Sequence, residues 1–208
     1  MIGSSMQAQP VIGKGARAQA LLSDGVVGIR RFCLADIPEH FAATRESIKE
    51  LSTSMLWCLP NHSLEDSTNF VLTRDAEWAK DSQYSFAIFD AKDGAFLGSV
   101  GLNGVNRAHN FANLGYWVRS SRTGHGFASA ATRLVAWFGL KEIGLGRLEI
   151  LVGVDNQPSQ RVAEKAGARR EGILRNRLVI QSRPQDAVLY SFVPEDFKST
   201  PNWPGLQP

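Results

Sequence analysis

The stretch Arg122-Thr123-Gly124-His125-Gly126-Phe127-Ala128 decides the fold, because two glycines join an expected strand at 113–118 to an expected helix. The apolar residues of that helix repeat on one face: Phe127, Ala131, Leu134, Val135 and Phe138. Glycine allows a sharp turn and a close approach of backbone amides, and a helix N-terminus attracts anions. The turn is therefore a candidate phosphate-binding site, although many strand-to-helix turns with two glycines bind nothing. It is neither a Walker A loop nor a complete dinucleotide fingerprint, because the Gly-Lys-Ser/Thr and the third glycine are missing.

The segments around this turn alternate between the two kinds of regular structure. Upstream, strands are expected at 26–32, 85–90 and 96–100, and helices from Asp36 to Leu51 and from Ser63 to Lys80. Downstream we expect a strand at 148–152, a short helix at 158–166 that stops at Gly167, and strands around 168–174, 178–181 and 187–192. This order predicts one α+β domain with a mixed, mostly antiparallel sheet and flanking helices.

The composition fits a single globular domain. The chain has 208 residues, 43% of them apolar and 21% charged. We expect a flexible arm at 1–22, one domain at 23–198 and a loose tail at 199–208. The two cysteines exclude a disulfide framework, and neither a signal peptide nor a spanning apolar run is visible, so a cytoplasmic location is expected.

Charge is distributed unevenly along the chain, although the net charge is only +3. Residues 61–95 hold seven acidic and three basic side chains, whereas residues 105–183 hold thirteen basic and five acidic ones. The second half therefore favours an anionic partner. Nucleic acid, a phosphorylated cofactor and a merely solvated basic face all remain open on charge alone.

A second polar group of residues, Asp155-Asn156-Gln157-Pro158-Ser159, follows the strand at 148–152 and begins the next helix, with Lys165-Ala166-Gly167-Ala168 behind it. By itself this pattern is typical of ordinary helix capping by Asn156 or Ser159. The glycine turn at 124–126 and this polar segment, at their spacing along the chain, are together a far more specific signal than either is alone.

These segments, with Glu171-Gly172, Gly115-Tyr116-Trp117-Val118 and Asp186-Ala187-Val188-Leu189-Tyr190, resemble the GNAT acetyltransferase superfamily. The branch they resemble most acetylates the N-termini of ribosomal proteins. The resemblance covers residues 28–197. It implies that acetyl-CoA is the acetyl donor, bound in the opening between two splayed parallel strands.

The resemblance also implies roles for individual residues. Tyr116, Trp117 and Val118 would pair with the pantetheine arm, and backbone amides of the turn from Thr123 to Ala128 would hold the pyrophosphate. Asn156 would bond the pantetheine, and Ser159 would lie near the thioester sulfur as proton donor. The family often has Gln or Arg at the position of Thr123, and here the nearest basic residue is Arg122. The basic side chains expected near the phosphates are Arg122, Arg161 and Lys165.

Amine acylation also requires a base for the acceptor. An N-terminal α-amine, with a pKa of about 7.7–8.0, is already partly neutral, whereas a lysine near 10.4 needs a stronger base. The candidates for this base are Glu171, His109 and His125, and a water-relayed path is the alternative. Cys33 and Cys58 lack the neighbours that activate a thiol, and the four histidines lack metal-ligand spacing, so we expect neither an acyl-cysteine nor a metal.

Three functions remain open from the sequence. The first is a protein N-terminal acetyltransferase, whose partners are acetyl-CoA and a protein N-terminus. The second acylates a small amine such as a polyamine, amino acid or antibiotic, and the third is a CoA-binding module without turnover. The two upstream helices are expected on the acceptor side. Direct nucleic-acid or membrane binding is not expected, and the oligomeric state is open.

Overall fold

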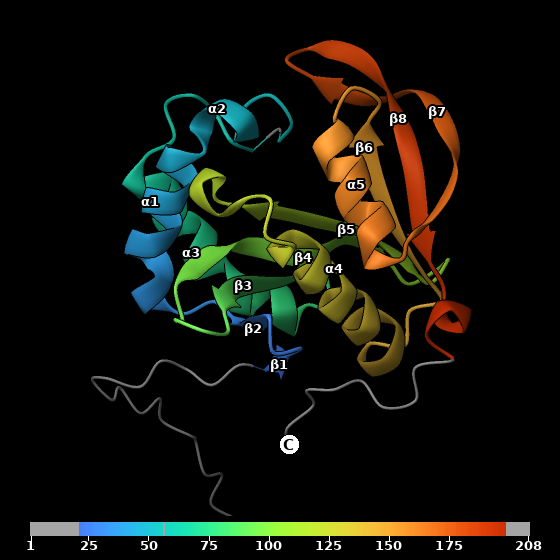
Figure 1. Cartoon of the computed structure of the whole chain (residues 1–208), viewed down its shortest axis with the longest axis horizontal. Coiled ribbons are helices and arrows are strands. Elements are labelled where there is room, and N and C mark those ends of the chain that lie inside the picture. Colours follow the sequence, from blue (N-terminus) through green and yellow to red (C-terminus); the bar gives the residue numbers. More distant parts are fainter. Residues whose placement is uncertain (1–20, 56, 199–208) are drawn as a thin grey trace, which may run out of the picture.

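The computed structural model describes residues 21–55 and 57–198. Eight strands form one sheet in the order β1-β2-β3-β4-β5-β6-β8-β7 (Figure 1). The strands are β1 (Leu22–Ser23), β2 (Val27–Arg31), β3 (Tyr84–Asp90), β4 (Phe96–Asn106), β5 (Phe111–Val118), β6 (Arg147–Gly153), β7 (Arg169–Ile180) and β8 (Arg183–Phe192). All neighbouring pairs are antiparallel except β5 and β6, which are parallel.

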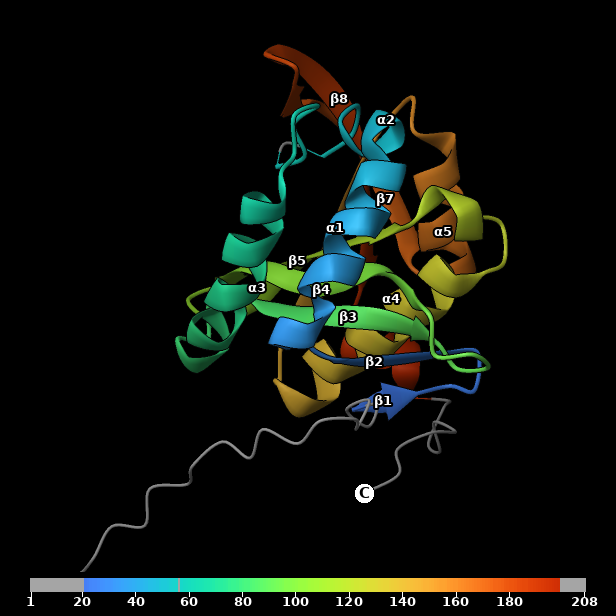
Figure 2. The same cartoon turned by 90° about the vertical axis from the view of Figure 1, so that its left-hand side faces the viewer.

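Helices cover both faces of this sheet. The helices are α1 (Ile37–Glu46), α2 (Ile48–Leu51), α3 (Leu64–Ala79), α4 (Phe127–Trp137) and α5 (Gln157–Ala166). Figures 1 and 2 show α1 and α3 on one face and α4 on the other, with α5 beside α4. The predicted α+β class with flanking helices is confirmed.

Several helix ends follow directly from the sequence. Ser63 caps α3 in a capping box, accepting from the Asp66 N–H at 3.1 Å while its own N–H donates to the Asp66 carboxylate at 2.8 Å. Asn156 caps α5, and Gly167 ends it in a left-handed conformation.

Three boundaries differ from those expected. The helix expected from Asp36 to Leu51 is broken at Ser47 into α1 and α2. Leu22, assigned to the arm, is buried and pairs with Ile29 as part of β1. The two strands expected at 168–174 and 178–181 are one strand, β7, whose register shifts between Leu174 and Leu178. The rest of the expected arm, residues 1–20, and the expected tail, 199–208, lie outside the described residues.

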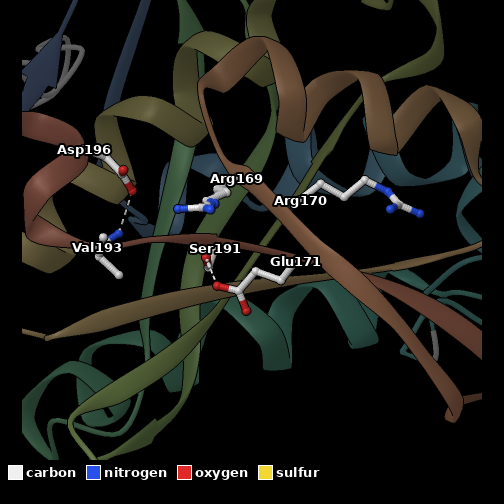
Figure 3. Close-up of a pocket in the computed structure, with 6 residues that line it drawn as sticks. All are labelled: Arg169, Arg170, Glu171, Ser191, Val193 and Asp196. Atoms are coloured by element: carbon white, nitrogen blue, oxygen red, sulfur yellow. Dashed lines mark hydrogen bonds between the residues drawn. The ribbon is translucent and has the colours of Figure 1, made fainter.

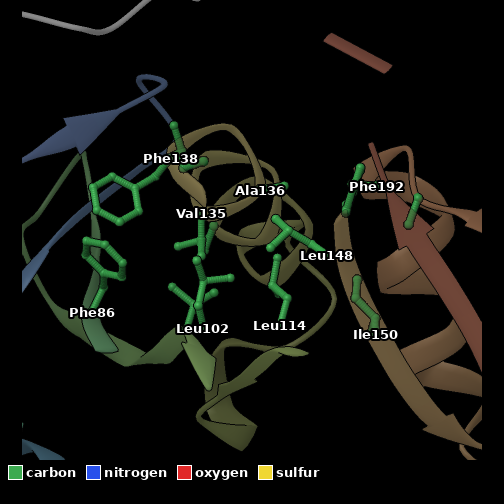
Figure 4. Packing of buried hydrophobic residues seen from close by; sticks show 14 of the residues in the cluster. Phe86, Leu102, Leu114, Val135, Ala136, Phe138, Leu148, Ile150 and Phe192 are labelled. Atoms are coloured by element: carbon green, nitrogen blue, oxygen red, sulfur yellow. The ribbon is translucent and has the colours of Figure 1, made fainter. Parts of the chain in front are cut away.

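The main core lies between the sheet and α4. Figure 4 shows Val135 and Ala136 of α4 packed toward Leu102 and Leu114 of the central strands. A second cluster of buried residues lies on the other face, under α1 and α3: Phe32, Ala43, Leu51, Cys58, Val71, Ala87, Phe96 and Trp117. Successive residues of β5 therefore point into different layers, Tyr116 toward α5 and Trp117 toward α1.

Candidate active site

The parallel strands β5 and β6 separate part-way along their length. Their pairing runs from Phe111 with Arg147 to Asn113 with Glu149 and stops there, whereas β5 continues to Val118 and β6 to Gly153. Beyond Asn113 the two strands no longer share a ladder, which leaves a slot between them. This is the splay expected from the sequence.

The edge of β5 that faces this slot carries backbone groups able to pair with a ligand. The Arg119 N–H donates to the Leu97 carbonyl on β4 at 2.7 Å, and Val118 lies opposite Gly98. Hydrogen-bonding groups alternate sides along a strand, so the N–H and C=O of Val118 and Tyr116 point away from β4 and toward the slot. Trp117 by the same alternation turns its backbone to β4, and its ring is buried on the far face.

Tyr116 and Ser159 meet across the slot. The Tyr116 hydroxyl lies 2.9 Å from the Ser159 carbonyl, to which it donates, and 3.0 Å from Ser159 Oγ. Burial raises the pKa of Tyr116 to about 12, so this hydroxyl stays protonated at neutral pH. The Asn156 Oδ1 atom accepts the Ser159 N–H at 3.1 Å, which leaves the Asn156 amide N–H groups to donate to a ligand. These three sequence-predicted residues are therefore brought together.

The glycine turn lies at the N-terminus of α4. Gly126 is the N-cap residue with φ +85°, and Gly124 has φ +82°. No described atom lies within 4 Å of the position that a Cβ would take at either glycine. The backbone is thus exposed to open space at the positive end of a helix dipole, which fits an anion such as a pyrophosphate.

Side chains at the end of α1 and at its junction with α2 hold the segment that leads into this turn. The Glu46 carboxylate pairs with Arg119 and accepts the Ser121 N–H at 2.8 Å, while Ser47 Oγ accepts the Ser120 N–H at 2.9 Å. The Arg119 guanidinium lowers the pKa of Glu46 to about 2. The glycine turn is therefore fixed to a helix on the opposite face of the sheet.

The basic side chains predicted to bind phosphate are less well placed for it than the backbone of the glycine turn. Arg122 lies 3.4 Å from the Asp90 carboxylate and 3.2 Å from the Asp93 carboxylate, so nearby acids already balance its charge. Lys165 and Arg161 are exposed on α5. Phosphate contacts by these three side chains remain predictions.

Glu171, a predicted base, is not brought to the slot. It pairs with Arg147 at 2.6 Å and accepts from Ser191 Oγ at 2.5 Å, and these bonds lower its pKa to about 2. Ser191 lies opposite Glu149, at the end of β6 that is still paired with β5. Figure 3 shows Glu171 in a surface cavity of about 380 Å³ lined by Arg169, Arg170, Glu171, Ser191, Val193 and Asp196. A carboxylate already held by Arg147 and Ser191, and placed at the paired end of β6, is badly positioned to act as the base for the acceptor.

The two histidines proposed as bases also lie elsewhere. His109 is exposed in the turn before β5, near the paired end of the strands. His125 belongs to the glycine turn, where its Nδ1 atom donates to the Thr123 carbonyl at 2.8 Å and its ring stacks on Phe127. None of the three candidates lies beside Trp117, on the α1 and α3 face.

Among residues 21–55 and 57–198, no group of three or more His, Cys, Asp or Glu side chains could hold a metal ion. In the same part of the chain, no helix combines the length and apolar character needed to cross a membrane. Cys58 is buried, which raises the pKa of its thiol and makes it a weak nucleophile.

Comparison with known proteins identifies the family. The family model described as "Acetyltransferase (GNAT) domain" matches residues 27–169. The chain belongs to the GNAT acetyltransferases. This confirms the family predicted from the sequence, whose members use acetyl-CoA as co-substrate.

Individual relatives match only part of this chain. The chain is 38% identical to "Probable N-acetyltransferase YjcK" of Bacillus subtilis over 56% of this chain and 66% of that protein. It is 29% identical to "Ribosomal-protein-serine acetyltransferase" of Escherichia coli over 51% of this chain and 58% of the relative. The chain thus spans less than two thirds of the length of either.

A solved structure of similar fold is RimJ of Mycobacterium smegmatis in complex with CoA-disulfide. It is 27% identical, has a TM-score of 0.76, and the match covers 85% of this chain and 86% of RimJ. The microcin C7 self-immunity acetyltransferase MccE, in complex with acetyl-CoA and AMP, shares the fold with a TM-score of 0.74 at 21% identity, over 81% of this chain and 92% of that one.

Proposed function

We propose that the protein transfers the acetyl group of acetyl-CoA directly to the α-amine of a protein N-terminus. The observation that carries this proposal is the slot between β5 and β6, which has a free strand edge on one side and the Tyr116–Ser159 pair across it. Relatives named "Ribosomal-protein-serine acetyltransferase" and "Putative ribosomal N-acetyltransferase YdaF" support a protein acceptor. We propose a single domain over residues 22–198 for this activity, with Leu22 included because it pairs within the sheet.

In this proposal the donor lies on the α4 and α5 face. Backbone amides of Thr123–Ala128 bind the pyrophosphate, and the edge of β5 at Tyr116 and Val118 pairs with the pantetheine amides. The Asn156 amide bonds the same arm. A backbone N–H of the free β5 edge also stabilises the oxyanion that forms when the amine attacks the thioester carbonyl.

The leaving group is protonated from α5. As the C–S bond breaks, Ser159 Oγ gives its proton to the thiolate sulfur, and the Tyr116 hydroxyl, 3.0 Å away, turns its proton from the Ser159 carbonyl to Ser159 Oγ, transfers it there and is resupplied by water. The high pKa of Tyr116 keeps that proton available across the physiological range. Positioned acids of this kind contribute about 10²–10⁴-fold to rates.

The test is an acceptor panel with acetyl-CoA, read by free thiol release and by mass spectrometry of the acceptor. The panel compares a peptide with a free N-terminal Ser or Ala, the same peptide with a blocked N-terminus and an internal Lys, and small amines such as spermidine. We expect acetylation of the free N-terminus and little of the blocked peptide. Faster transfer to spermidine would refute the protein acceptor, and CoA binding without any transfer would refute the activity.

A further inference from the structure

A buried chain of hydrogen bonds joins two histidines through one serine, outside the donor site described above. His40 Nδ1 on α1 lies 3.0 Å from Ser67 Oγ on α3, and His62 Nε2 lies 2.9 Å from the same oxygen. His40 and Ser67 are at most 1% exposed and His62 is 6% exposed. We refer to these three residues as the histidine chain.

The chain has a direction because Ser67 has a single proton. If Ser67 donates to His62, then His40 Nδ1 must donate to Ser67, and His40 Nε2 is a bare lone pair. If Ser67 donates to His40, the bonds reverse and His40 Nε2 carries the hydrogen. The two arrangements interconvert when each bond passes one proton along, so the chain is able to conduct a proton between its ends.

The free end of the chain is the Nε2 atom of His40. It is buried and has no hydrogen-bond partner among the described residues. An unpaired buried polar atom is costly and calls for an explanation. Aromatic rings surround the His40 ring, and of these Trp57 is the exposed one, at 45%. The ring neighbours of His40 are Phe32, Trp57, Phe70, Phe96 and Trp117.

The chain is in its neutral, proton-accepting form at neutral pH. Burial lowers the pKa of His40 to about 4 and also lowers that of His62. The charged groups that face His40 are Asp36, before α1, and Arg74 from α3, and those that face His62 are Asp66 and Arg45.

The position of the chain matches the side from which an acceptor must come. Tyr116 and Ser159 place the donor on the α4 and α5 face, so the amine approaches the thioester carbonyl from the other face of β5. There the Trp117 ring lies 5.7 Å from the His40 ring, and Trp57 lies 6.1 Å from Trp117. An acceptor that displaces the exposed Trp57 indole opens a path from β5 to His40 Nε2.

We propose that the histidine chain removes the proton of the acceptor amine. As the N–C bond forms, the amine N–H bond breaks and its proton passes to His40 Nε2, directly or through one water. In the same step His40 Nδ1 gives a proton to Ser67 Oγ, Ser67 gives its own to His62 Nε2, and His62 Nδ1 releases one to solvent, so no charged imidazolium forms at the buried His40. This inference rests on the proposed acetyl transfer. His40 is the catalytic base, and Ser67 and His62 are relay residues.

The experiment compares the variants Ser67→Ala and His62→Gln with the unaltered protein. The peptide is the acceptor, and the pH profiles of kcat and kcat/KM are measured. The matched control is Thr44→Val, which removes a buried hydroxyl of α1 that has no hydrogen-bond partner among the described residues. The glutamine in His62→Gln can still form a hydrogen bond with Ser67 but cannot pass a proton from it to solvent. This variant therefore tests the relay even if Ser67→Ala does not fold. Melting temperature and CoA binding report on folding.

We expect both relay variants to lose about 10²-fold in kcat at neutral pH while CoA affinity is kept. The unaltered profile should level off above the pKa of the acceptor amine, whereas the variants should keep rising with pH and gain rate from added imidazole. A structural defect would lower the profile without changing its shape. If His62→Gln shows the same rate and pH profile as Thr44→Val, the relay is overturned and the proposed function stands. If the unaltered protein transfers no acetyl group, the proposed function is overturned together with the relay.

Discussion

Replacing Gly126 by Ala should separate coenzyme binding from stability. In the free protein the methyl group meets no described atom within 4 Å, so its cost is that of a left-handed backbone at φ +85°, about 1–2 kcal/mol. At about 2–4 °C per kcal/mol for a domain of this size, the melting temperature should fall by roughly 2–8 °C.

The response to ligand should fall much further. At 100 times Kd, CoA stabilises the unaltered protein by about 2.7 kcal/mol. If the methyl group costs one charge-assisted N–H bond to phosphate, about 1.5–3 kcal/mol, affinity drops roughly tenfold to 100-fold. The same CoA concentration then stabilises the variant by only about 0.4–1.4 kcal/mol. Thermal unfolding with and without CoA measures this difference.

Gly144 provides the matched control. It has φ +73°, is exposed like Gly126, and also has no described atom within 4 Å of a Cβ. Gly144→Ala should therefore lose similar stability and keep the whole CoA shift. An undiminished CoA shift in Gly126→Ala would refute the placement of the pyrophosphate at this turn.

The other predictions concern single side chains. Ser159→Ala should lower kcat by about 10²-fold with CoA affinity unchanged, as measured by steady-state kinetics and titration; an unaltered kcat would leave Ser159 a structural residue. Glu171→Gln should lower the melting temperature through loss of the Arg147 pair and leave kcat within about twofold, a range far below the contribution of a catalytic base; a tenfold fall would restore it as a base. The folded pKa of Glu46, about 2, lies below its unfolded value, so its contribution to stability is complete above that value and declines as pH falls toward 2. Denaturant titrations from pH 7 to pH 3 should show a smaller decline in Glu46→Gln.

The sequence predicted the parts of the fold that local patterns encode. Alternation and capping identified the strands and the start of α3 at Ser63, because these signals lie within a few residues of one another. The break at Ser47 and the joining of two segments into β7 depend on packing and pairing with distant strands, so no local pattern revealed them.

The same limit applies to the site. The glycine turn and Asn156-x-x-Ser159 are local motifs. The structure brings Ser159 to Tyr116, two residues for which the resemblance implies contacts with the same ligand. Glu171 was misjudged because its partner Arg147 is 24 residues away and meets it only through strand register. The histidine chain was missed for a related reason, since His40 and Ser67 are 27 residues apart.

The short ladder between β5 and β6 divides the sheet into two parts, and we call this ladder the hinge between them. Backbone pairing between β5 and β6 is confined to the pairs from Phe111 to Asn113, the Tyr116–Ser159 contact bridges the two parts farther along, and β5 extends about 16 Å beyond the ladder, at roughly 3.3 Å per residue. A rotation of about 5° at the hinge would move the strand tip by roughly 1.4 Å on that lever arm. The width of the slot at the thioester therefore depends on residues far from it. Substitutions at the hinge should change how much that width fluctuates, although these residues contact neither substrate.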